Sequence, residues 1–432
     1  MKRFFKKTLT YIITWQSRIV VFKYKPKIIA ITGSVGKTST KQAIFSIIST
    51  KKTVRMSEKS FYNEIGLPLT ILGCYDGGED LFMWIGTIIH GFRLIVWKHK
   101  YPEFLILEVG LRNPGDIKNK VANWLKPDVV IITRMPSCPS HIEFFDSLEK
   151  LEEEKISLVK SLKKDGLLIL NHDDERVYSL HEMSESRTVS FGLDQNSTYQ
   201  ILYLIENYQK EEGDQGVQSG INFKIKYGGN TFPVWLPNVL GLHNAGIVTS
   251  ALACTKELGF DLLESIEVIS SFKTPAGRLS RLEGINDSII IDDSYNSSPL
   301  ALEVALNVLK EMRGRRKIAV LGDMLELGKY TEREHRLVGL KVSEIADKLI
   351  VVGQRAKMIA GGAIENNFFK KDIVYFNEAK EAGDYLVKEI KEGDVILVKG
   401  SQKMRMEKMI EEIMRDKDKK KELLCRQSKD WQ

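Results

Sequence analysis

The sequence predicts an α/β protein in which two consecutive units are each built around a mainly parallel β-sheet. Short, near-continuous apolar runs alternate with longer segments of helical character, the pattern of parallel strands that are covered on both faces. The chain has 432 residues, enough for two or three domains. With 43% hydrophobic and 28% charged residues, the composition excludes fibrous and wholly disordered classes.

The two units follow from the order of these runs. The expected strands are 28–31, 104–109, 129–133 and 167–171 in the first unit, and 289–291, 317–321, 348–352 and 395–398 in the second. Between them, residues 198–237 alternate apolar and polar side chains around Gly228-Gly229, which predicts an antiparallel hairpin, and a helix is expected over 244–258. The predicted divisions are an N-terminal segment 1–26, a central domain 27–273, a C-terminal domain 274–415 and a charged tail 416–432. Within the tail, we expect the charge run 416–421 to be a solvated helix end or disordered.

Net charge and cysteine content limit the kinds of partner and the cellular compartment that are expected for this protein. The net charge of +7 is mild for this length, so we expect no nucleic-acid partner. The four cysteines are scattered and form no CxxC pair, which suits a protein of the reducing cytoplasm. Two basic and apolar segments, 1–27 and 81–97, are too interrupted to span a bilayer. Two interpretations stay open for them: amphipathic helices packed on the body or on each other, or peripheral contact with the inner face of a membrane.

A phosphate-binding loop follows the first strand. The sequence Thr32-Gly-Ser-Val-Gly-Lys-Thr-Ser39 stands between a buried strand and a helix, where backbone N–H groups can close on phosphate oxygens. Lys37 can reach the β- and γ-phosphates, and the Thr38 hydroxyl can bind Mg²⁺. An ordinary glycine-rich turn would explain the glycines but not Lys37 and Thr38 together. The expected ATP-binding residues are Gly33, Ser34, Val35, Gly36, Lys37, Thr38 and Ser39.

Two further strand ends offer polar groups. Glu108 ends the apolar run 104–107, at the sheet edge where α/β proteins bind ligands, and it is either a Mg²⁺ ligand or a solvated charge. His141 and Glu143 follow the next strand after a loop that contains proline.

A lysine lies on the apolar face of the helix that follows. Lys155 is seven residues from Leu148 and from Leu162, two helical turns each way, whereas Glu152, Glu153 and Glu154 mostly point elsewhere. Such a lysine snorkels, pairs or loses its charge. A neutral, desolvated lysine can also react with CO₂ to form a carbamate, an anionic metal ligand.

The second unit opens with a further set of polar residues. Arg278 stands at the junction of the units, where an arginine can stabilise a transferring phosphoryl group. The run Asp292–Pro299 follows a strand and can hold a nucleoside, although each of these segments could also be an ordinary turn.

Together these segments resemble the Mur ligases, the ATP-dependent amide-forming enzymes of peptidoglycan synthesis. The resemblance covers residues 27–415, and within the family the branch that adds D-alanyl-D-alanine to a UDP-muramoyl tripeptide is the most similar. The strings that carry it are TGSVGKT (32–38), NEIGLP (63–68), EVG (108–110), HIE (141–143) with Lys155, LGLHN (240–244), GR (277–278), DDSYNSSP (292–299), LGDMLELG (321–328) and KGS (399–401).

The resemblance implies a central P-loop ATP-binding domain, a Rossmann-like C-terminal domain and residue roles. Thr38 and Glu108 would bind one Mg²⁺, and His141 and carbamylated Lys155 the second. Arg278 would reach the γ-phosphate. The implied nucleoside contacts are Asn244, Asp293, Tyr295 and Asn296. The implied reaction joins D-alanyl-D-alanine to a muramoyl peptide through an acyl phosphate, with Lys37, Lys155, Arg278 and His141 as the catalytic residues.

The chain departs from that family in three places. Only 26 residues precede the first strand, so recognition of the UDP moiety would fall to segment 81–97 or to a partner. The loop before His141 is about two residues longer than usual, and Ile247 stands where the family has asparagine. Two alternatives therefore stay beside the leading one: a ligase that uses a lipid-linked or other carboxylate acceptor at the membrane, and a non-catalytic nucleotide-binding scaffold.

Overall fold

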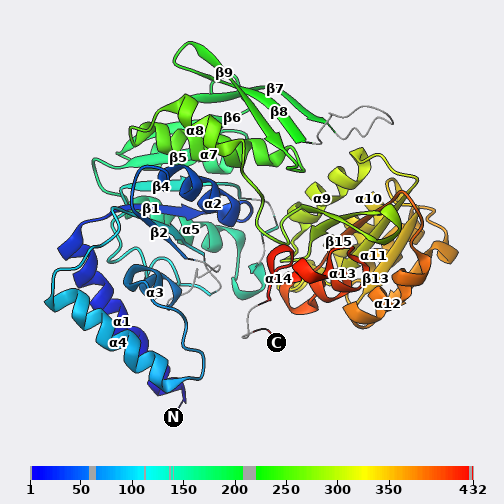
Figure 1. Ribbon diagram of the computed structural model, residues 1–432, viewed down its shortest axis with the longest axis horizontal. Helices are drawn as coiled ribbons and strands as arrows, with labels where there is room; N and C mark the ends of the chain where they lie inside the picture. The colour runs from blue at the N-terminus through cyan, green and yellow to red at the C-terminus, as the bar shows by residue number, and fades with distance from the viewer. Residues whose placement is uncertain are drawn as a thin grey trace.

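Two mainly parallel sheets, one of nine strands and one of six, organise the part of the chain that the structure describes. The structure is a computed structural model and describes residues 2–57, 65–110, 113–135, 138–139, 141–207, 220–427 and 431, with the backbone alone for 2–6 and 207. Figure 1 shows the first sheet with its helices on the left and the second sheet with its helices on the right. The α/β class predicted from the apolar runs is confirmed.

The first sheet contains the strands that were expected from the apolar runs and several that were not. Its strands are β1 (Lys27–Thr32), β2 (Val54–Met56), β3 (Phe104–Glu108), β4 (Val129–Ile132), β5 (Leu167–Asn171), β6 (Arg187–Gly192), β7 (Tyr199–Asn207), β8 (Gly220–Tyr227) and β9 (Asn230–Pro237). The order is β2-β3-β1-β4-β5-β6-β7-β8-β9, parallel as far as β7. Strands β7, β8 and β9 are antiparallel, so the expected hairpin is confirmed, whereas β2 and β6 were not anticipated.

Helices cover both faces of this sheet. The helices of this part are α1 (Lys2–Tyr24), α2 (Lys37–Ile48), α3 (Gly66–Leu72), α4 (Leu81–Val96), α5 (Leu148–Lys160), α6 (Glu175–Tyr178), α7 (His243–Glu257) and α8 (Leu262–Ile269). Ile29 and Ile31 of β1 share a core with α2, α7 and α8. Ile28 and Ala30 point to the other face and share a core with α1, α3 and α5.

The two basic and apolar segments form α1 and α4, which lie beside each other and are parallel (Figure 1). Gln16 Nε2 donates to the carbonyl of Ile88 at 2.9 Å, and Lys23 Nζ donates to the carbonyl of Leu94 at 2.9 Å. The expectation that these helices pack on each other and on the body is confirmed. Among the described residues, no helix is long and apolar enough to cross a membrane.

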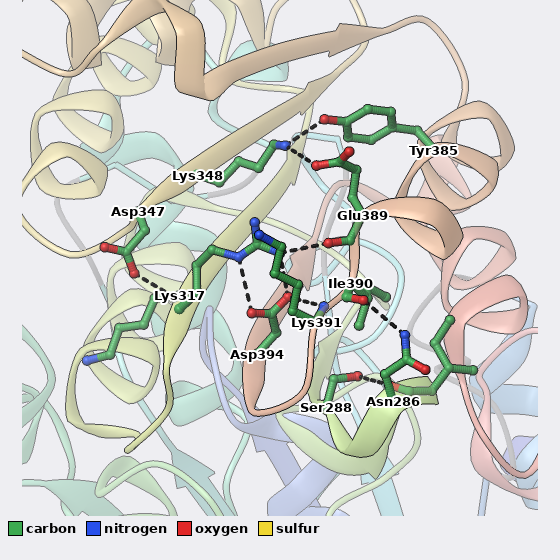
Figure 2. A network of polar contacts seen from close by, with 12 residues as sticks. Asn286, Ser288, Lys317, Asp347, Lys348, Tyr385, Glu389, Ile390, Lys391 and Asp394 are labelled. Atoms are coloured by element: carbon green, nitrogen blue, oxygen red, sulfur yellow. Dashed lines mark hydrogen bonds and ion pairs between the residues drawn. The ribbon is translucent and has the colours of Figure 1, made fainter.

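The second sheet has the order β10-β11-β15-β12-β13-β14, antiparallel only between its first two strands. Its elements are β10 (Ser280–Glu283), β11 (Ile289–Asp293), α9 (Pro299–Glu311), β12 (Arg316–Gly322), α10 (Thr331–Ser343), β13 (Lys348–Val352), α11 (Lys357–Glu365), β14 (Ile373–Phe376), α12 (Ala379–Glu389), β15 (Asp394–Lys399), α13 (Glu407–Ile413) and α14 (Lys420–Leu423). At the amino ends of its strands, polar contacts join the sheet to the helix beside it: Lys348, the first residue of β13, contacts Tyr385 and Glu389 of α12 (Figure 2).

The end of the C-terminal tail packs against the C-terminal domain. Residues 416–421 are mostly exposed, whereas Leu424, Cys425 and Arg426 are buried. The reason is a set of polar partners: Arg426 donates to the carbonyls of Tyr295 and Ser294 at 2.7 and 2.8 Å, and it also pairs with Glu407. The tail therefore returns to the side of the C-terminal domain that faces the central domain (Figure 1).

Candidate active site

The phosphate-binding loop lies between β1 and α2, at the carboxyl end of the first sheet. Gly33 has φ +135°, and a Cβ atom there would stand 2.0 Å from Thr133 Oγ1. Gly36 has φ +89° and is the residue before α2 begins at Lys37. Both positions therefore require glycine, and the loop leaves the N–H groups at the start of α2 available to an anion.

Glu108 is brought beside this loop by strand pairing. Strand β3 is the parallel neighbour of β1, with Glu108 opposite Ile31. Thr38 Oγ1 lies 3.1 Å from both carboxylate oxygens of Glu108. Lys37 Nζ donates to the carbonyl of Gly33 at 2.8 Å, and burial lowers the pKa of this lysine. A hydroxyl and a carboxylate thus meet next to a cation at the start of the helix.

Lys155 reaches the same loop from α5. Its Nζ donates to Ser34 Oγ at 2.9 Å, and the residue is only 4% exposed, so the side chain does not snorkel to solvent. Burial, reinforced by the charge of Lys37, lowers the pKa of Lys155 to about 7. A substantial fraction of this amine is therefore neutral near pH 7, which is the form that reacts with CO₂.

The neighbouring Glu154 adds one detail to the helical prediction. It points away from the side of Lys155, as the spacing predicts, but it is buried, because its carboxylate accepts N–H groups of Gly115, Ile117 and Lys118 at 2.6, 2.8 and 3.0 Å. The acid thus caps a turn on the far side of α5, while Lys155 occupies the side that faces the loop.

His141 connects the two domains. It adopts φ +73°, and its Nδ1 lies 2.5 Å from a carboxylate oxygen of Glu326, which follows β12 in the C-terminal domain. The N–H of Glu143 also donates to the carbonyl of Glu326 at 3.3 Å. Pro136, Ser137 and Ser140 of the preceding loop lie outside the described residues, as do Asn63 and Glu64 of another predicted motif.

The C-terminal domain adds a cationic and aromatic wall. The guanidinium of Arg278 stacks on the ring of Tyr295, 4.2 Å from its centre. Lys399, at the end of β15, donates to Asp293 at 2.6 Å and to the carbonyl of Asn296 at 2.7 Å. These contacts fix the loop after β11 against the end of the neighbouring strand.

The start of α7 supplies polar groups that suit a nucleoside. Asn244 Nδ2 donates to the carbonyl of Leu240 at 2.7 Å, whereas its Oδ1 is buried and has no hydrogen-bond partner among the described residues. Burial and the charges of Arg134 and Lys399 lower the pKa of His243 to about 4, so this ring is neutral near pH 7. An unpaired buried acceptor of this kind is costly unless a ligand donates to it.

One cavity between the domains brings the predicted residues together. All fifteen sequence-predicted site residues line it: Gly33, Ser34, Val35, Gly36, Lys37, Thr38, Ser39, Glu108, His141, Lys155, Asn244, Arg278, Asp293, Tyr295 and Asn296. A more apolar cavity of about 380 Å³ adjoins it and shares Val35, Gly36, His243, Ile247 and Val304. The polar cavity suits phosphates, and the apolar one suits a flat ring.

Three buried or paired residues of this region were not assigned a role from the sequence. Lys41 Nζ lies 3.4 Å from Glu108, and its position four residues after Lys37 on one helix face was a usable signal. Lys399 ends a strand, as Glu108 does. The rule that α/β proteins bind ligands at the carboxyl ends of their strands would therefore have indicated this lysine too. Glu326 belongs to a quoted motif, but its contact with His141 depends on how the two domains meet.

The residues present fit a magnesium ion. Among the described residues, no three His, Cys, Asp or Glu side chains gather as a metal-binding group. The donors near the phosphate loop are instead the hydroxyl of Thr38 and the carboxylate of Glu108. Mg²⁺ is usually held by one or two carboxylates together with substrate phosphates and water, so this sparse oxygen set suits it better than a closed metal site would.

Comparison with known proteins agrees with this site. The "Mur ligase middle domain" matches residues 92–254, and "Mur ligase, glutamate ligase domain" matches residues 277–402. The UDP-N-acetylmuramoyl-tripeptide–D-alanyl-D-alanine ligase of Bacillus subtilis (strain 168) is 30% identical over 393 residues, covering 90% of this chain and 76% of that protein. The chain belongs to the Mur ligase family. The enzyme of the same name from Escherichia coli (strain K12) is 26% identical and covers 89% of this chain and 76% of its own length.

Solved Mur ligases share the fold. The MurF ligase of Thermotoga maritima in complex with ADP superposes with a TM-score of 0.75 at 24% identity, covering 93% of this chain and 83% of that one. MurF from Acinetobacter baumannii gives 0.74 at 22% identity, covering 93% and 79%. The resemblance deduced from the motifs is confirmed, and the chain is an ATP-dependent ligase of this family.

Proposed function

We propose that this Mur ligase joins D-alanyl-D-alanine to a UDP-muramoyl tripeptide at the expense of ATP. The observation that carries the proposal is the single cavity to which three distant segments contribute Lys37, Lys155 and Arg278. Similarity over 90% of the chain to an enzyme that bears this activity in its name supports the choice of substrates. A scaffold without catalysis has no need of Glu108, His141 and Lys155 around one cavity.

The first chemical step activates the tripeptide. An oxygen of its terminal carboxylate attacks the γ-phosphorus of ATP, the bond to the β-phosphate oxygen breaks, and ADP and an acyl phosphate result. Two anions must approach each other in this step, so Lys37 and Arg278 would lower the barrier by neutralising the phosphoryl oxygens. The amides from Gly33 to Thr38 would hold the phosphates in line.

The second step forms the amide. The amino nitrogen of the dipeptide attacks the acyl carbon, the tetrahedral intermediate expels inorganic phosphate, and the nitrogen loses a proton. Mg²⁺ would supply charge neutralisation and orientation, held by Thr38 and Glu108 at one position and by His141 and a carbamate on Lys155 at another. Because Arg278 and Glu326 come from the C-terminal domain, closure of the two domains would complete the site.

Carbamylation of Lys155 is a further part of the proposal. The neutral Nζ attacks CO₂, a nitrogen–carbon bond forms, and a proton passes to water, which leaves an anionic carbamate. The support is the burial of this amine and its lowered pKa. ¹³C NMR after incubation with ¹³C-bicarbonate tests it: a carbamate signal is expected from the wild type and not from Lys155→Ala.

Asn244 and the apolar cavity are proposed to bind the adenine. The unpaired Oδ1 of Asn244 would accept from the exocyclic amino group, and Ile247 and Val304 would flank the ring. An ATP to GTP exchange reverses donor and acceptor at that ring position, so GTP should be used at least about tenfold less efficiently.

The test of the proposed function is phosphate release by the purified chain. With ATP, Mg²⁺, UDP-muramoyl tripeptide and D-alanyl-D-alanine, we expect release that needs all four, and omission of any substrate should abolish it. Phosphate release that does not depend on the dipeptide would contradict the proposal, and so would the absence of any phosphate release. We place the reaction in the cytoplasm because all four cysteines, Cys74, Cys138, Cys254 and Cys425, are unpaired thiols.

A further inference from the structure

The exposed side of α1 alternates basic and aromatic side chains. Lys7, Tyr11, Trp15, Arg18 and Phe22 are exposed and follow one another at intervals of three or four residues, so they form one stripe along the helix. Tyr11 and Phe22 are 75% and 79% exposed. The opposite side of the helix is buried in the core, so the exposed stripe makes no contribution to the packing of the fold.

A second, fully apolar stripe runs along α4. Phe82, Ile85, Ile89, Phe92 and Val96 are exposed at helical spacing, and Phe82 is 84% exposed. The ring of Phe92 lies 6.2 Å from that of Trp15, so the two stripes meet in one surface. We call this surface the α1–α4 face; its apolar members are Tyr11, Trp15, Phe22, Leu81, Phe82, Met83, Ile85, Ile89, Phe92, Val96 and Trp97.

The concentration of apolar side chains on this face is unusual for the molecule. Of the 23 large apolar side chains that are exposed among the described residues, eleven lie on α1, on α4 or at Trp97. The other twelve are spread over the rest of the chain. A contiguous exposed apolar surface of this kind marks a binding site, whereas scattered single residues do not.

The charge of the same region is strongly positive. Residues 1–24 contain six basic and no acidic residues, and α4 contains one arginine and no acidic residue. The basic residues of the two helices and the segment after them are Lys2, Arg3, Lys6, Lys7, Arg18, Lys23, Arg93, Lys98 and Lys100. The acids nearest in sequence are Asp76, Glu79 and Asp80 before α4 and Glu103 after Lys100. Asp80 caps α4 by accepting the N–H of Phe82 at 2.8 Å, and Glu103 pairs with Lys52.

We propose that the α1–α4 face docks on the surface of a bilayer rich in anionic lipid, with both helices lying in the plane of the interface. Exposed aromatic and aliphatic side chains would enter the boundary between headgroups and acyl chains, and the lysines and arginines would meet anionic headgroups. The two helices lie at the edge of the central domain far from the C-terminal domain (Figure 1). Docking therefore leaves the cavity between the domains open.

Binding of the intact chain to vesicles tests this. Co-sedimentation is measured with vesicles of phosphatidylcholine alone and with vesicles that contain about 30% phosphatidylglycerol. We expect binding to the anionic vesicles, weaker binding to the neutral ones, and loss of binding as salt rises. Brominated lipid should quench tryptophan fluorescence, because Trp15 and Trp97 belong to the face.

Matched variants locate the surface. Tyr11→Ser/Trp15→Ser/Phe22→Ser removes three exposed rings from α1 and should weaken binding at least about tenfold. Leu337→Ser/Leu340→Ser/Phe369→Ser removes three exposed apolar side chains from the C-terminal domain and should change it by less than about twofold. Circular dichroism and ligase activity without vesicles should be unchanged in both, which separates this proposal from the proposed function.

Three outcomes would overturn the proposal. The first is that the wild type does not bind anionic vesicles, and the second is that both triple variants bind them equally. The third is that light scattering shows a dimer that only the first triple variant abolishes, without binding of the protein to vesicles. The last result would assign the face to a second copy of the chain.

Discussion

The two ends of the C-terminal sheet each hold an ion pair with a buried aspartate, and the pairs differ in what surrounds them. At the amino end, Arg316 donates to both oxygens of Asp394 at 3.1 and 2.6 Å. The N–H of Lys391 donates to the same carboxylate at 2.9 Å (Figure 2). At the carboxyl end, Lys399 pairs with Asp293 at 2.6 Å and both line the cavity. The first pair is enclosed by protein partners, and the second borders space for a ligand.

This difference shows how residues that mainly support stability can be distinguished from residues that mainly support function in this fold. A buried charge with all its partners in the protein contributes to stability once it is there, because removal of one partner leaves the other uncompensated. A charge that borders a cavity retains capacity for a ligand, and its loss is felt mainly in binding or catalysis. The predictions below test that separation.

The largest effect is expected in the cavity, from Lys155→Ala. If the carbamate holds a metal ion, kcat/KM should fall at least about a thousandfold, because an anionic ligand at the reacting phosphate is lost. The free energy of unfolding should not fall, since burying an amine of lowered pKa is itself unfavourable. Phosphate release and urea unfolding measure the two quantities.

Two controls accompany this variant. Lys160→Ala lies on the same helix but is exposed, and it should leave both quantities unchanged. Acetate, which offers a free carboxylate, should restore part of the activity of Lys155→Ala. A variant that is inactive only because it is unfolded would not be rescued by acetate. Absence of rescue would therefore mean that Lys155 has no role in the site.

The opposite pattern is expected at the amino end, from Asp394→Asn. The change leaves Arg316 without its charge partner, so the free energy of unfolding should fall by about 3 kcal/mol. The KM for ATP should stay within about twofold, because the site lies at the other end of the strands. Glu392→Gln is the matched control, since Glu392 makes only an exposed 3.8 Å pair with Arg315 and should cost less than about 0.5 kcal/mol.

Much of the site was predictable because it depends on local pattern. Parallel strands that are buried on both faces give apolar runs, and Glu108 follows directly at the end of one. The seven-residue spacing put Lys155 on the buried side of α5. The loop that begins at Gly33 is defined by its own sequence and by the strand before it.

The remaining parts depend on contacts between distant segments. Lys399 meets Asp293 only because β15 inserts next to β11, and no local pattern gives that strand order. Glu154 lies on a charged stretch of α5, yet it is buried because a turn nearly forty residues earlier presents its N–H groups. The surface exposed by α1 and α4 likewise depends on which side of each helix the body covers.

A smaller effect, one that depends on pH, is expected from Asp292 beside the cavity. Burial, more than any other cause, raises the pKa of this carboxyl to about 6, and its Oδ2 has no partner among the described residues. Between pH 4 and pH 6 the native chain therefore binds more protons here than the unfolded chain, so stability falls as the pH rises through that range. Asp292→Asn keeps the acceptor for the N–H of Ser294 and should be about 2 kcal/mol more stable at pH 7.

Urea unfolding of both proteins at a series of pH values checks this prediction. The two stability curves should converge below about pH 4, where the carboxyl is protonated in both states, and diverge toward pH 7. Parallel curves at all pH values would show that Asp292 does not carry the raised pKa.

The smallest effect on the reaction is expected from Arg426, which acts on the cavity through Tyr295, while loss of its buried pair with Glu407 should also lower stability. Its guanidinium lies 5.6 Å from the centre of the Tyr295 ring, on which Arg278 stacks, and donates to the carbonyl of Tyr295 at 2.7 Å. Arg426→Gln should loosen the nucleotide loop and raise the KM for ATP about fivefold, with kcat within about twofold, because no contact to the reacting phosphate is lost.

The split between KM and kcat distinguishes this positioning role from a merely structural one. Arg415→Gln, an exposed arginine near the end of α13, is the matched control and should alter neither constant. Arg426→Lys keeps the charge opposite Glu407 but not the paired donors, so its KM should lie between those of the wild type and Arg426→Gln. Equal losses of kcat and kcat/KM in Arg426→Gln would instead mean that the tail stabilises the transition state. The C-terminal tail would then belong with the residues that support function at the carboxyl end of the sheet.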